Sequence, residues 1–152
     1  MTRSDVLHVE RGHGATIVGD LATGAGIPRD SFDAIVLVQT LQFIYEVRAA
    51  IGVLHDALTP GGVLLVTAPG ISQLSRYDAD RWGEFWRFTR ESMARLLTER
   101  FGPANVDVKA HGNVKTAIAF LHGLAREELG SGDLDVDDPD YELVLTARAV
   151  RR

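Results

Sequence analysis

The sequence of 152 residues contains no cysteine. Disulfide bonds, thiolate metal sites and a cysteine nucleophile are therefore excluded within this chain. Long apolar segments are also lacking, since the longest runs are Ala34–Val38 and Gly61–Pro69, both too short to span a bilayer. Because the first residues contain no apolar stretch of signal-peptide length, the sequence predicts a cytoplasmic protein with no membrane partner.

Basic residues are in deficit. Sixteen Lys and Arg stand against 21 Asp and Glu, which gives a net charge of -5 with neutral histidine. Lys109 and Lys115 are the only lysines, and no basic stripe of the kind that follows a phosphate backbone is present. We therefore expect no nucleic-acid partner. The remaining composition, 45% hydrophobic and 24% charged, is that of an ordinary globular chain.

Strand patterns recur along the chain. Short strand-like runs cover residues 6–9 and 15–18. Residues 32–38 read Phe-Asp-Ala-Ile-Val-Leu-Val and residues 63–66 read Val-Leu-Leu-Val, so both predict strands covered on two faces, as in a parallel sheet. Residues 106–110 alternate apolar and charged side chains and predict a half-buried strand, and residues 141–150 predict a last one.

Helical spacing appears between the strands. In residues 44–58, apolar positions recur at steps of three and four, which predicts an amphipathic helix that stops at the Thr-Pro-Gly-Gly turn of residues 59–62. A second helix is expected over residues 89–101, starting from a threonine N-cap, and a third over residues 114–125. Strands that alternate with helices predict an α/β fold with a mostly parallel sheet, in a single domain over residues 1–152.

Acidic side chains stand near the ends of the predicted strands. In open α/β sheets, ligands bind beyond the carboxyl ends of the strands. Asp5 and Asp20 are carboxylates of the kind that accept hydrogen bonds from ribose hydroxyls or an adenine amino group. Both equally fit as caps of ordinary turns. The pattern alone leaves these two interpretations open.

Three ordered motifs carry a resemblance. They are Val-Gly-Asp-Leu at 18–21, Phe-Asp-Ala-Ile-Val-Leu-Val-Gln-Thr-Leu at 32–41 and Leu-Thr-Pro-Gly-Gly-Val-Leu-Leu-Val-Thr-Ala-Pro at 58–69. In this order and spacing, the chain resembles a class I S-adenosylmethionine-dependent methyltransferase of the type 11 kind. Two later segments, Trp-Gly-Glu-Phe-Trp-Arg-Phe-Thr at 82–89 and His-Gly-Asn-Val at 111–114, resemble a bacterial subgroup sometimes attached to sugar-transferring modules. The resemblance implies a Rossmann-like fold with an antiparallel C-terminal strand, and S-adenosylmethionine as cofactor.

The resemblance also implies cofactor-binding residues. Asp5 matches the acid that follows the family's second strand and holds the ribose. Asp20 matches the acid after the third strand, which contacts the adenine amino group, and Leu21 would pack on the ring. The segment that would line the methionine side of the cofactor consists of Gln39, Thr40 and Leu41.

One part of the family pattern has no counterpart in this sequence. Met1 falls where the family's second strand begins, so we expect an N-terminally truncated domain without the first strand, its Gly-rich loop and the first helix. The glycine clusters at 12–14, 24–26 and 130–132 do not fit that loop and predict ordinary turns. Three arrangements are open: the second strand closes onto the fourth, two copies form a homodimer that covers the gap, or the natural chain is longer.

Further residues are candidates for catalysis and acceptor binding. His111 lies between a strand and a helix, where it could act as a general base or bind loop carbonyls. Tyr77 could hydrogen-bond the acceptor. The substrate-binding candidates are Trp82, Trp86 and Asn113, and the aromatic cluster is equally interpretable as a lid that shields the sheet. No histidine pair has metal-ligand spacing, so no metal site is predicted.

The sequence thus predicts a methyltransferase that moves a methyl group from S-adenosylmethionine to a small-molecule acceptor, with a saccharide as one candidate. The alternative is a non-catalytic methyltransferase-like interaction module or remnant that no longer binds the cofactor. The two hypotheses differ in whether this chain binds S-adenosylmethionine.

Overall fold

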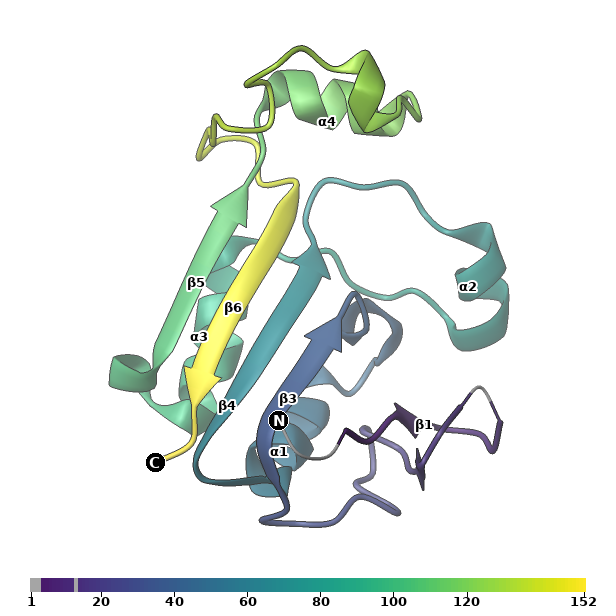
Figure 1. Ribbon diagram of the computed structural model, residues 1–152, viewed down its shortest axis with the longest axis vertical. Coiled ribbons are helices and arrows are strands. Elements are labelled where there is room, and N and C mark those ends of the chain that lie inside the picture. Colours follow the sequence, from purple (N-terminus) through teal and green to yellow (C-terminus); the bar gives the residue numbers. More distant parts are fainter. Residues whose placement is uncertain (1–3, 13) are drawn as a thin grey trace.

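Strands and helices alternate along residues 4–12 and 14–152, the part of the chain that the computed structural model describes (Figure 1). The strands are β1 (Leu7–His8), β2 (Ile17–Val18), β3 (Phe32–Val38), β4 (Leu58–Pro69), β5 (Val106–His111) and β6 (Val144–Val150). The α-helices are α1 (Val47–Ala57), α2 (Arg76–Trp82), α3 (Arg90–Phe101) and α4 (Val114–Leu121), and 3₁₀ turns cover Leu41–Phe43, Pro103–Asn105 and Arg126–Glu128. This order confirms the α/β class.

The strands form two separate sheets. β1 and β2 pair in parallel, and a four-stranded sheet has the order β3-β4-β6-β5. β3 is parallel to β4, whereas β6 runs antiparallel to both of its neighbours. The mostly parallel sheet with an antiparallel C-terminal strand is therefore confirmed. β1 is not hydrogen-bonded to β3. The arrangement in which the second strand of the family closes onto the fourth concerns the strand before Asp5, which would fall on residues 1–3, outside the described residues, so it stays a prediction.

One face of the four-stranded sheet is covered by helices. In Figure 1, α1 and α3 lie behind the strands. Leu64 of β4 and Leu145 of β6 are almost fully buried on this face, as are Ile51 of α1 and Leu97 of α3. Burial of an aliphatic side chain of this size stabilises a fold by about 1.5–3 kcal/mol. The interface between sheet and helices is therefore the core of the molecule.

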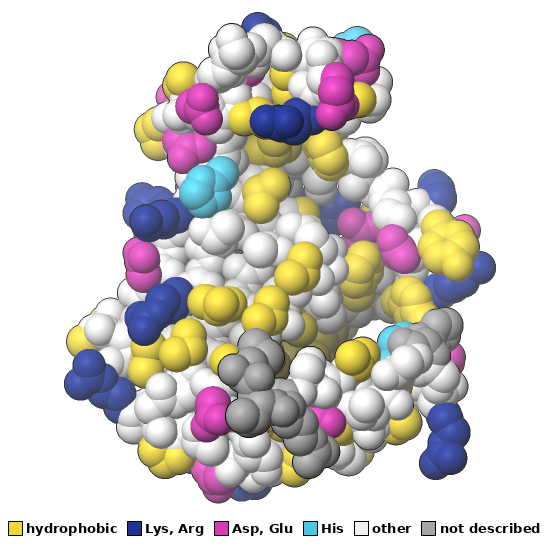
Figure 2. Space-filling model, viewed as in Figure 1, with side chains coloured by type: hydrophobic (Ala, Val, Ile, Leu, Met, Phe, Trp, Pro, Cys, Tyr) yellow, Lys and Arg dark blue, Asp and Glu magenta, His cyan; other side chains and the backbone are white. Residues whose placement is uncertain are grey.

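The opposite face of the sheet, here called the bare face, has no helix over it within the described ranges. It faces the viewer in Figure 1, and Figure 2 shows hydrophobic side chains gathered there. Val36 pairs with Leu65, and these residues are 62% and 42% exposed, while Val38 is 60% exposed. The row through Leu65 continues with Arg148 of β6 and Asp107 of β5, both exposed. The prediction that β3 and β4 are covered on both faces is therefore wrong for the described residues.

Local signals set the ends of α3. The side chain of Thr89 accepts a hydrogen bond from the backbone N–H of Ser92, and the flanking Phe88 and Met93 are both buried. Gly102 follows the helix with φ of 79°, a conformation that glycine adopts without steric cost. The predicted N-cap and the predicted helix end are confirmed.

Several boundaries differ from the predictions. The helix predicted over residues 114–125 ends at Leu121, and the chain turns at Gly123, which has φ of 73°. The last strand begins at Val144, and β1 and β2 each keep two residues of the predicted runs. The polar segment between β4 and α3 contains α2, in which no residue is buried. Helical periodicity could not reveal α2, because a helix without a buried side has no apolar stripe.

Candidate functional site

The ends of β1, β2 and β3 open onto a pocket of about 440 Å³, here called the strand-end pocket. Its walls come from the ends of these strands, from residues 39–46 and from α2. The lining residues are Leu7, His8, Val9, Gly19, Asp20, Leu21, Ala22, Gln39, Thr40, Phe43, Ile44, Tyr45, Glu46, Asp78 and Trp82. This volume is typical of sites for small organic ligands. The structure therefore brings together four of the predicted cofactor-binding residues, Asp20, Leu21, Gln39 and Thr40.

Asp20 is held by the loop that follows β2. Its carboxylate accepts hydrogen bonds from the backbone N–H of Ala22 at 2.8 Å and from the Thr23 hydroxyl at 3.0 Å. The loop folds back because Gly26 has φ of 74°, and a Cβ there would collide with the carbonyl oxygen of Val18. Since each carboxylate oxygen has a second lone pair, Asp20 can close its own turn and still accept a hydrogen bond from a ligand.

Gln39 takes an uncommon backbone conformation directly after β3. Its φ is 46°, in the left-handed region that costs a residue with a side chain about 1–2 kcal/mol. Its backbone N–H lies 3.1 Å from Thr67 Oγ1 and 3.0 Å from the Thr67 carbonyl oxygen. Its own carbonyl accepts a hydrogen bond from Gln42 Nε2 at 2.9 Å. Backbone strain concentrates at functional sites, and this strained residue lines the strand-end pocket.

The strand-end pocket combines acidic and aromatic side chains. Asp20, Glu46 and Asp78 line it, and its described lining includes no Lys or Arg. Trp82, which is 40% exposed, meets His8 edge-on with ring centroids 5.9 Å apart. An exposed indole offers a face for stacking, and carboxylates accept hydrogen bonds and attract positive charge. The pocket therefore suits a ligand with a flat ring, hydrogen-bond donors and positive charge.

Two predicted cofactor-binding residues do not line this pocket. Asp5 precedes β1 and accepts a hydrogen bond from the Thr16 hydroxyl at 3.0 Å, while that hydroxyl oxygen accepts from the backbone N–H of Val6. The strand that the resemblance implies before Asp5 would fall on residues 1–3, which lie outside the described residues. The ribose-binding role of Asp5 therefore stays a prediction. Leu41 is 0% exposed in the core, so its side chain supports the pocket from behind instead of lining it.

Trp86 and Tyr77 also lie outside the strand-end pocket. Trp86 donates its indole N–H to the carbonyl of Ile44 at 3.0 Å and stacks on Tyr45, with ring centroids 5.9 Å apart. These contacts fix the segment that forms one wall of the pocket. Tyr77 is 67% exposed, and the Arg81 guanidinium lies 3.5 Å from its ring centroid. The acceptor-binding roles of Trp86 and Tyr77 stay predictions.

His111 and Asn113 belong to a separate network at the end of β5. His111 Nδ1 lies 3.2 Å from Asp137 Oδ2, and Nε2 lies 2.9 Å from Thr146 Oγ1. A hydrogen bond from the backbone N–H of Gly112, helped by His111, holds the pKa of the Asp137 carboxyl below its usual value. Asn113 caps α4 and donates to two carbonyls of the acidic loop. These contacts fit loop binding, and the roles of base and substrate ligand stay predictions.

Sequence reasoning missed several residues that line the strand-end pocket. Tyr45 and Glu46 follow the 3₁₀ turn after β3, and Asp78 comes from α2. The signal for Tyr45 and Glu46 is their position shortly after residues 39–41, the segment that follows β3. Asp78 carried no comparable signal, because α2 shows no helical periodicity.

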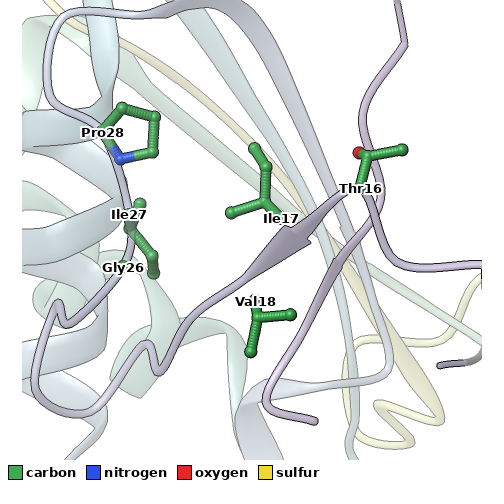
Figure 3. Close-up of a pocket in the computed structure, with 6 residues that line it drawn as sticks. All are labelled: Thr16, Ile17, Val18, Gly26, Ile27 and Pro28. Carbon is green, nitrogen blue, oxygen red and sulfur yellow. The ribbon is translucent and has the colours of Figure 1, made fainter. Parts of the chain in front are cut away.

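A shallower depression lies beside β2 and carries less chemistry. Figure 3 shows its lining, which consists of Thr16, Ile17, Val18, Gly26, Ile27 and Pro28. Its one polar side chain, Thr16, already donates to Asp5. Over the described ranges, no group of three or more His, Asp or Glu side chains is placed to hold a metal ion. No helix there has the length and apolar character needed to cross a membrane.

Comparisons with known proteins agree with this architecture. Residues 5–66 match the model of a family described as a methyltransferase domain. An S-adenosylmethionine-dependent methyltransferase from Mesorhizobium loti is similar with a TM-score of 0.57 and 20% identity, over 94% of this chain and 73% of that chain. The chain has the class I methyltransferase fold. The resemblance to a class I S-adenosylmethionine-dependent methyltransferase domain is thereby confirmed.

Two further solved structures share the methyltransferase fold. A methyltransferase from Thermotoga maritima, described as a possible histamine N-methyltransferase, has a TM-score of 0.56 at 15% identity, over 91% of this chain and 65% of that chain. The N-methyltransferase NodS from Bradyrhizobium japonicum, in complex with S-adenosyl-L-homocysteine, has a TM-score of 0.54 at 18% identity, over 97% of this chain and 65% of that chain. This chain thus spans 65% of the length of each. No curated protein matches it.

Proposed function

We propose that this chain binds S-adenosylmethionine in the strand-end pocket and transfers its methyl group to a small-molecule acceptor. The observation that carries the proposal is the convergence of Asp20, Gln39 and Thr40 on one pocket at the strand ends of a methyltransferase fold. The described lining is acidic and includes no Lys or Arg, which suits a cofactor whose sulfonium, ammonium and carboxylate groups leave a net positive charge.

The residues present fit such a cofactor. Trp82 would stack on the adenine, Asp20 would accept a hydrogen bond from the adenine amino group, and Glu46 would face positive charge. When bound, the cofactor supplies an electrophilic methyl group on sulfur. The contribution of the chain is to hold that methyl group in line with the acceptor, because proximity and orientation supply much of the rate.

Isothermal titration with S-adenosylhomocysteine tests the proposal. The wild-type chain is expected to bind, and Trp82→Ala is expected to weaken binding about tenfold, because stacking of a base on an aromatic side chain contributes about 1–3 kcal/mol. Leu74→Ala is the matched control, since Leu74 is 45% exposed beside α2 and does not line the pocket. A folded wild-type sample that does not bind at millimolar ligand would exclude the enzyme proposal for this chain alone.

A non-catalytic interaction module is the second candidate function. The observation that favours it is that no glycine-rich turn joins a strand to a helix at the strand-end pocket within the described residues. Backbone close to a ligand often requires glycine, because a side chain would occupy the space of the ligand. Methyl transfer from a labelled donor by the isolated chain would eliminate this candidate.

We also propose that two copies associate through the edge of β3. Among the described residues, β3 is hydrogen-bonded to β4 alone, and a gap of about 460 Å³ lies between it and β1. Most side chains that line this gap are apolar, with Asp5 and Thr40 as the polar ones. Unpaired backbone groups along a long strand form a template for pairing with another chain. Light scattering is expected to give a mass near twice 16.6 kDa, which Val36→Lys should reduce. The control Val114→Lys, at an exposed position that begins α4, should leave the mass unchanged. A monomeric mass at the highest concentration would overturn this proposal.

The place of action is part of the same proposal. A cytoplasmic location and an acceptor other than nucleic acid accord with the net charge of -5 and the absence of cysteine. Fractionation of the source cells, with the chain tracked by antibody, would test the location directly.

A further inference from the structure

A second pocket, of about 420 Å³, adjoins the strand-end pocket and lies between α2 and the end of β4. The two pockets share Gln39, Phe43 and Asp78 as lining residues. A ligand in the second pocket, here called the α2–β4 pocket, would therefore lie next to a ligand in the strand-end pocket. The side chains that line the α2–β4 pocket indicate the chemical class of the ligand that it would bind.

Gln42 is one of the residues that line the α2–β4 pocket, and its side chain has an unsatisfied oxygen. The residue is 5% exposed, and its Nε2 donates to the Gln39 carbonyl at 2.9 Å. Among the described residues, Gln42 Oε1 is the buried side-chain oxygen that has no hydrogen-bond partner. Buried polar atoms are nearly always paired, because an unpaired one loses its hydrogen bonds to water without replacement. A ligand that donates a hydrogen bond at this point would satisfy the oxygen.

The charge of the α2–β4 pocket favours a cation. Asp78 and Glu84 line it, and no Lys, Arg or His is part of its described lining. Glu84 is balanced, because its Oε1 lies 2.7 Å from Arg87 Nη2 and its Oε2 accepts from the backbone N–H of Ser75. Asp78 accepts from the Ser75 hydroxyl at 2.6 Å, and none of the ion pairs found among the described residues involves it. Its charge is therefore available to a ligand.

Apolar side chains complete the α2–β4 pocket. Phe43, Pro69 and Phe120 are among its lining residues, and Phe120 reaches it from α4. A ligand that matches this lining has an apolar body, a positive charge and at least one N–H donor. We infer that the α2–β4 pocket binds a primary or secondary amine, with its ammonium group between Gln42 Oε1 and Asp78 and its apolar body against the two phenylalanines.

This inference rests on the proposed function for its meaning, because the amine is a methyl acceptor only if a methyl donor occupies the strand-end pocket. The bound ammonium first releases one proton to solvent. The nitrogen lone pair then forms the N–C bond to the methyl group, while the C–S bond breaks and leaves its electron pair on sulfur. The methylated product carries the positive charge that sulfur lost.

Isothermal titration with a matched pair of probes tests the inference. Phenethylamine and 2-phenylethanol have nearly the same shape, and at pH 7 only the amine is charged. The wild-type chain is expected to bind phenethylamine at least tenfold more tightly. Equal affinity for the two probes, or no binding of the amine, would overturn the inference.

Two variants locate the amine. Asp78→Asn and Gln42→Met are each expected to reduce the preference for the amine to threefold or less, because they remove its charge partner or its hydrogen-bond acceptor. Asp80→Asn is the control, since Asp80 is an exposed acid of α2 outside the pocket and the substitution makes the same change in net charge. Loss of the preference in Asp80→Asn, or its retention in a folded Asp78→Asn, would contradict the assignment.

A parallel titration with S-adenosylhomocysteine separates this inference from the proposed function. Binding of S-adenosylhomocysteine without a preference for the amine would overturn the amine site and leave the proposed function standing. Binding of the amine without binding of S-adenosylhomocysteine would overturn the proposed function and leave an amine-binding pocket. Binding of both would support both.

Discussion

Leu64 and Leu65 are neighbours on β4 that point to opposite faces of the sheet, which makes them a test of the bare face. Leu64 is 0% exposed and packs in the core, whereas Leu65 is 42% exposed. Replacing a fully buried leucine with alanine costs about 3–4 kcal/mol of unfolding free energy, since the cavity adds to the lost burial. Leu65→Ala removes the same atoms from a site little more than half buried and leaves no closed cavity, so its expected cost is about 1 kcal/mol.

Urea denaturation followed by tryptophan fluorescence measures both costs. We expect the two variants to share the wild-type dependence on urea and to differ by about 2–3 kcal/mol, because only Leu64 leaves a cavity. Measurement at two protein concentrations separates the chain from its assemblies. If Leu65→Ala costs as much as Leu64→Ala at the lower concentration, the bare face is covered within one chain and the reasoning fails.

Three smaller changes test other parts of the structure. Thr89→Ala removes the N-cap of α3 and is expected to lower the free energy of unfolding by about 1 kcal/mol, which calorimetry would show as a Tm lower by about 2–4 °C. An unchanged Tm would show that the Thr89 side chain does not stabilise the helix. Gly26→Ala forces a Cβ against the Val18 carbonyl and should lower both Tm and the affinity for S-adenosylhomocysteine. Affinity equal to that of the wild type would contradict this prediction. A hydrogen bond from His55 lowers the pKa of Asp56, so its stabilisation is present above about pH 4 and lost as pH falls through the lowered pKa. Asp56→Asn should therefore be less stable than wild type at pH 6 by urea denaturation, and the difference should shrink as the pH falls below about 4 and through the lowered pKa of Asp56. A difference that stays constant with pH would refute this.

The central strands and their connecting helix could be predicted because their signals are local. Five successive apolar residues end β3, and the apolar spacing of α1 matches the face that packs in the core. The apolar run of β3 gave one wrong prediction, that both faces of the strand are covered. Val36 and Val38 indicate a strand covered on both sides, but their exposure depends on whether a helix crosses over them, which a strand's own residues do not determine.

The candidate site was predictable only where it follows strands. Asp20, Gln39 and Thr40 lie within two residues of the apolar runs that form β2 and β3, so their convergence follows from parallel strand topology. Asp78 and Gln42 could not be predicted in the same way. Asp78 lies on a short helix without an apolar stripe. The Nε2 of Gln42 donates to the Gln39 carbonyl and its Oε1 has no partner, and both facts depend on contacts that form only in the folded chain.

The strand-end pocket draws its walls from two sheets whose described strands share no hydrogen bond. A two-stranded ladder such as β1–β2 is marginally stable by itself in water. A ligand that contacts Asp20 on one side and Gln39 on the other therefore joins the two sheets, so binding and the local order of β1 and β2 are thermodynamically linked. Part of the intrinsic affinity is spent on ordering the smaller unit. Backbone amides of β1 and β2 should accordingly exchange with deuterium more slowly when ligand is bound, by a factor that grows with ligand concentration.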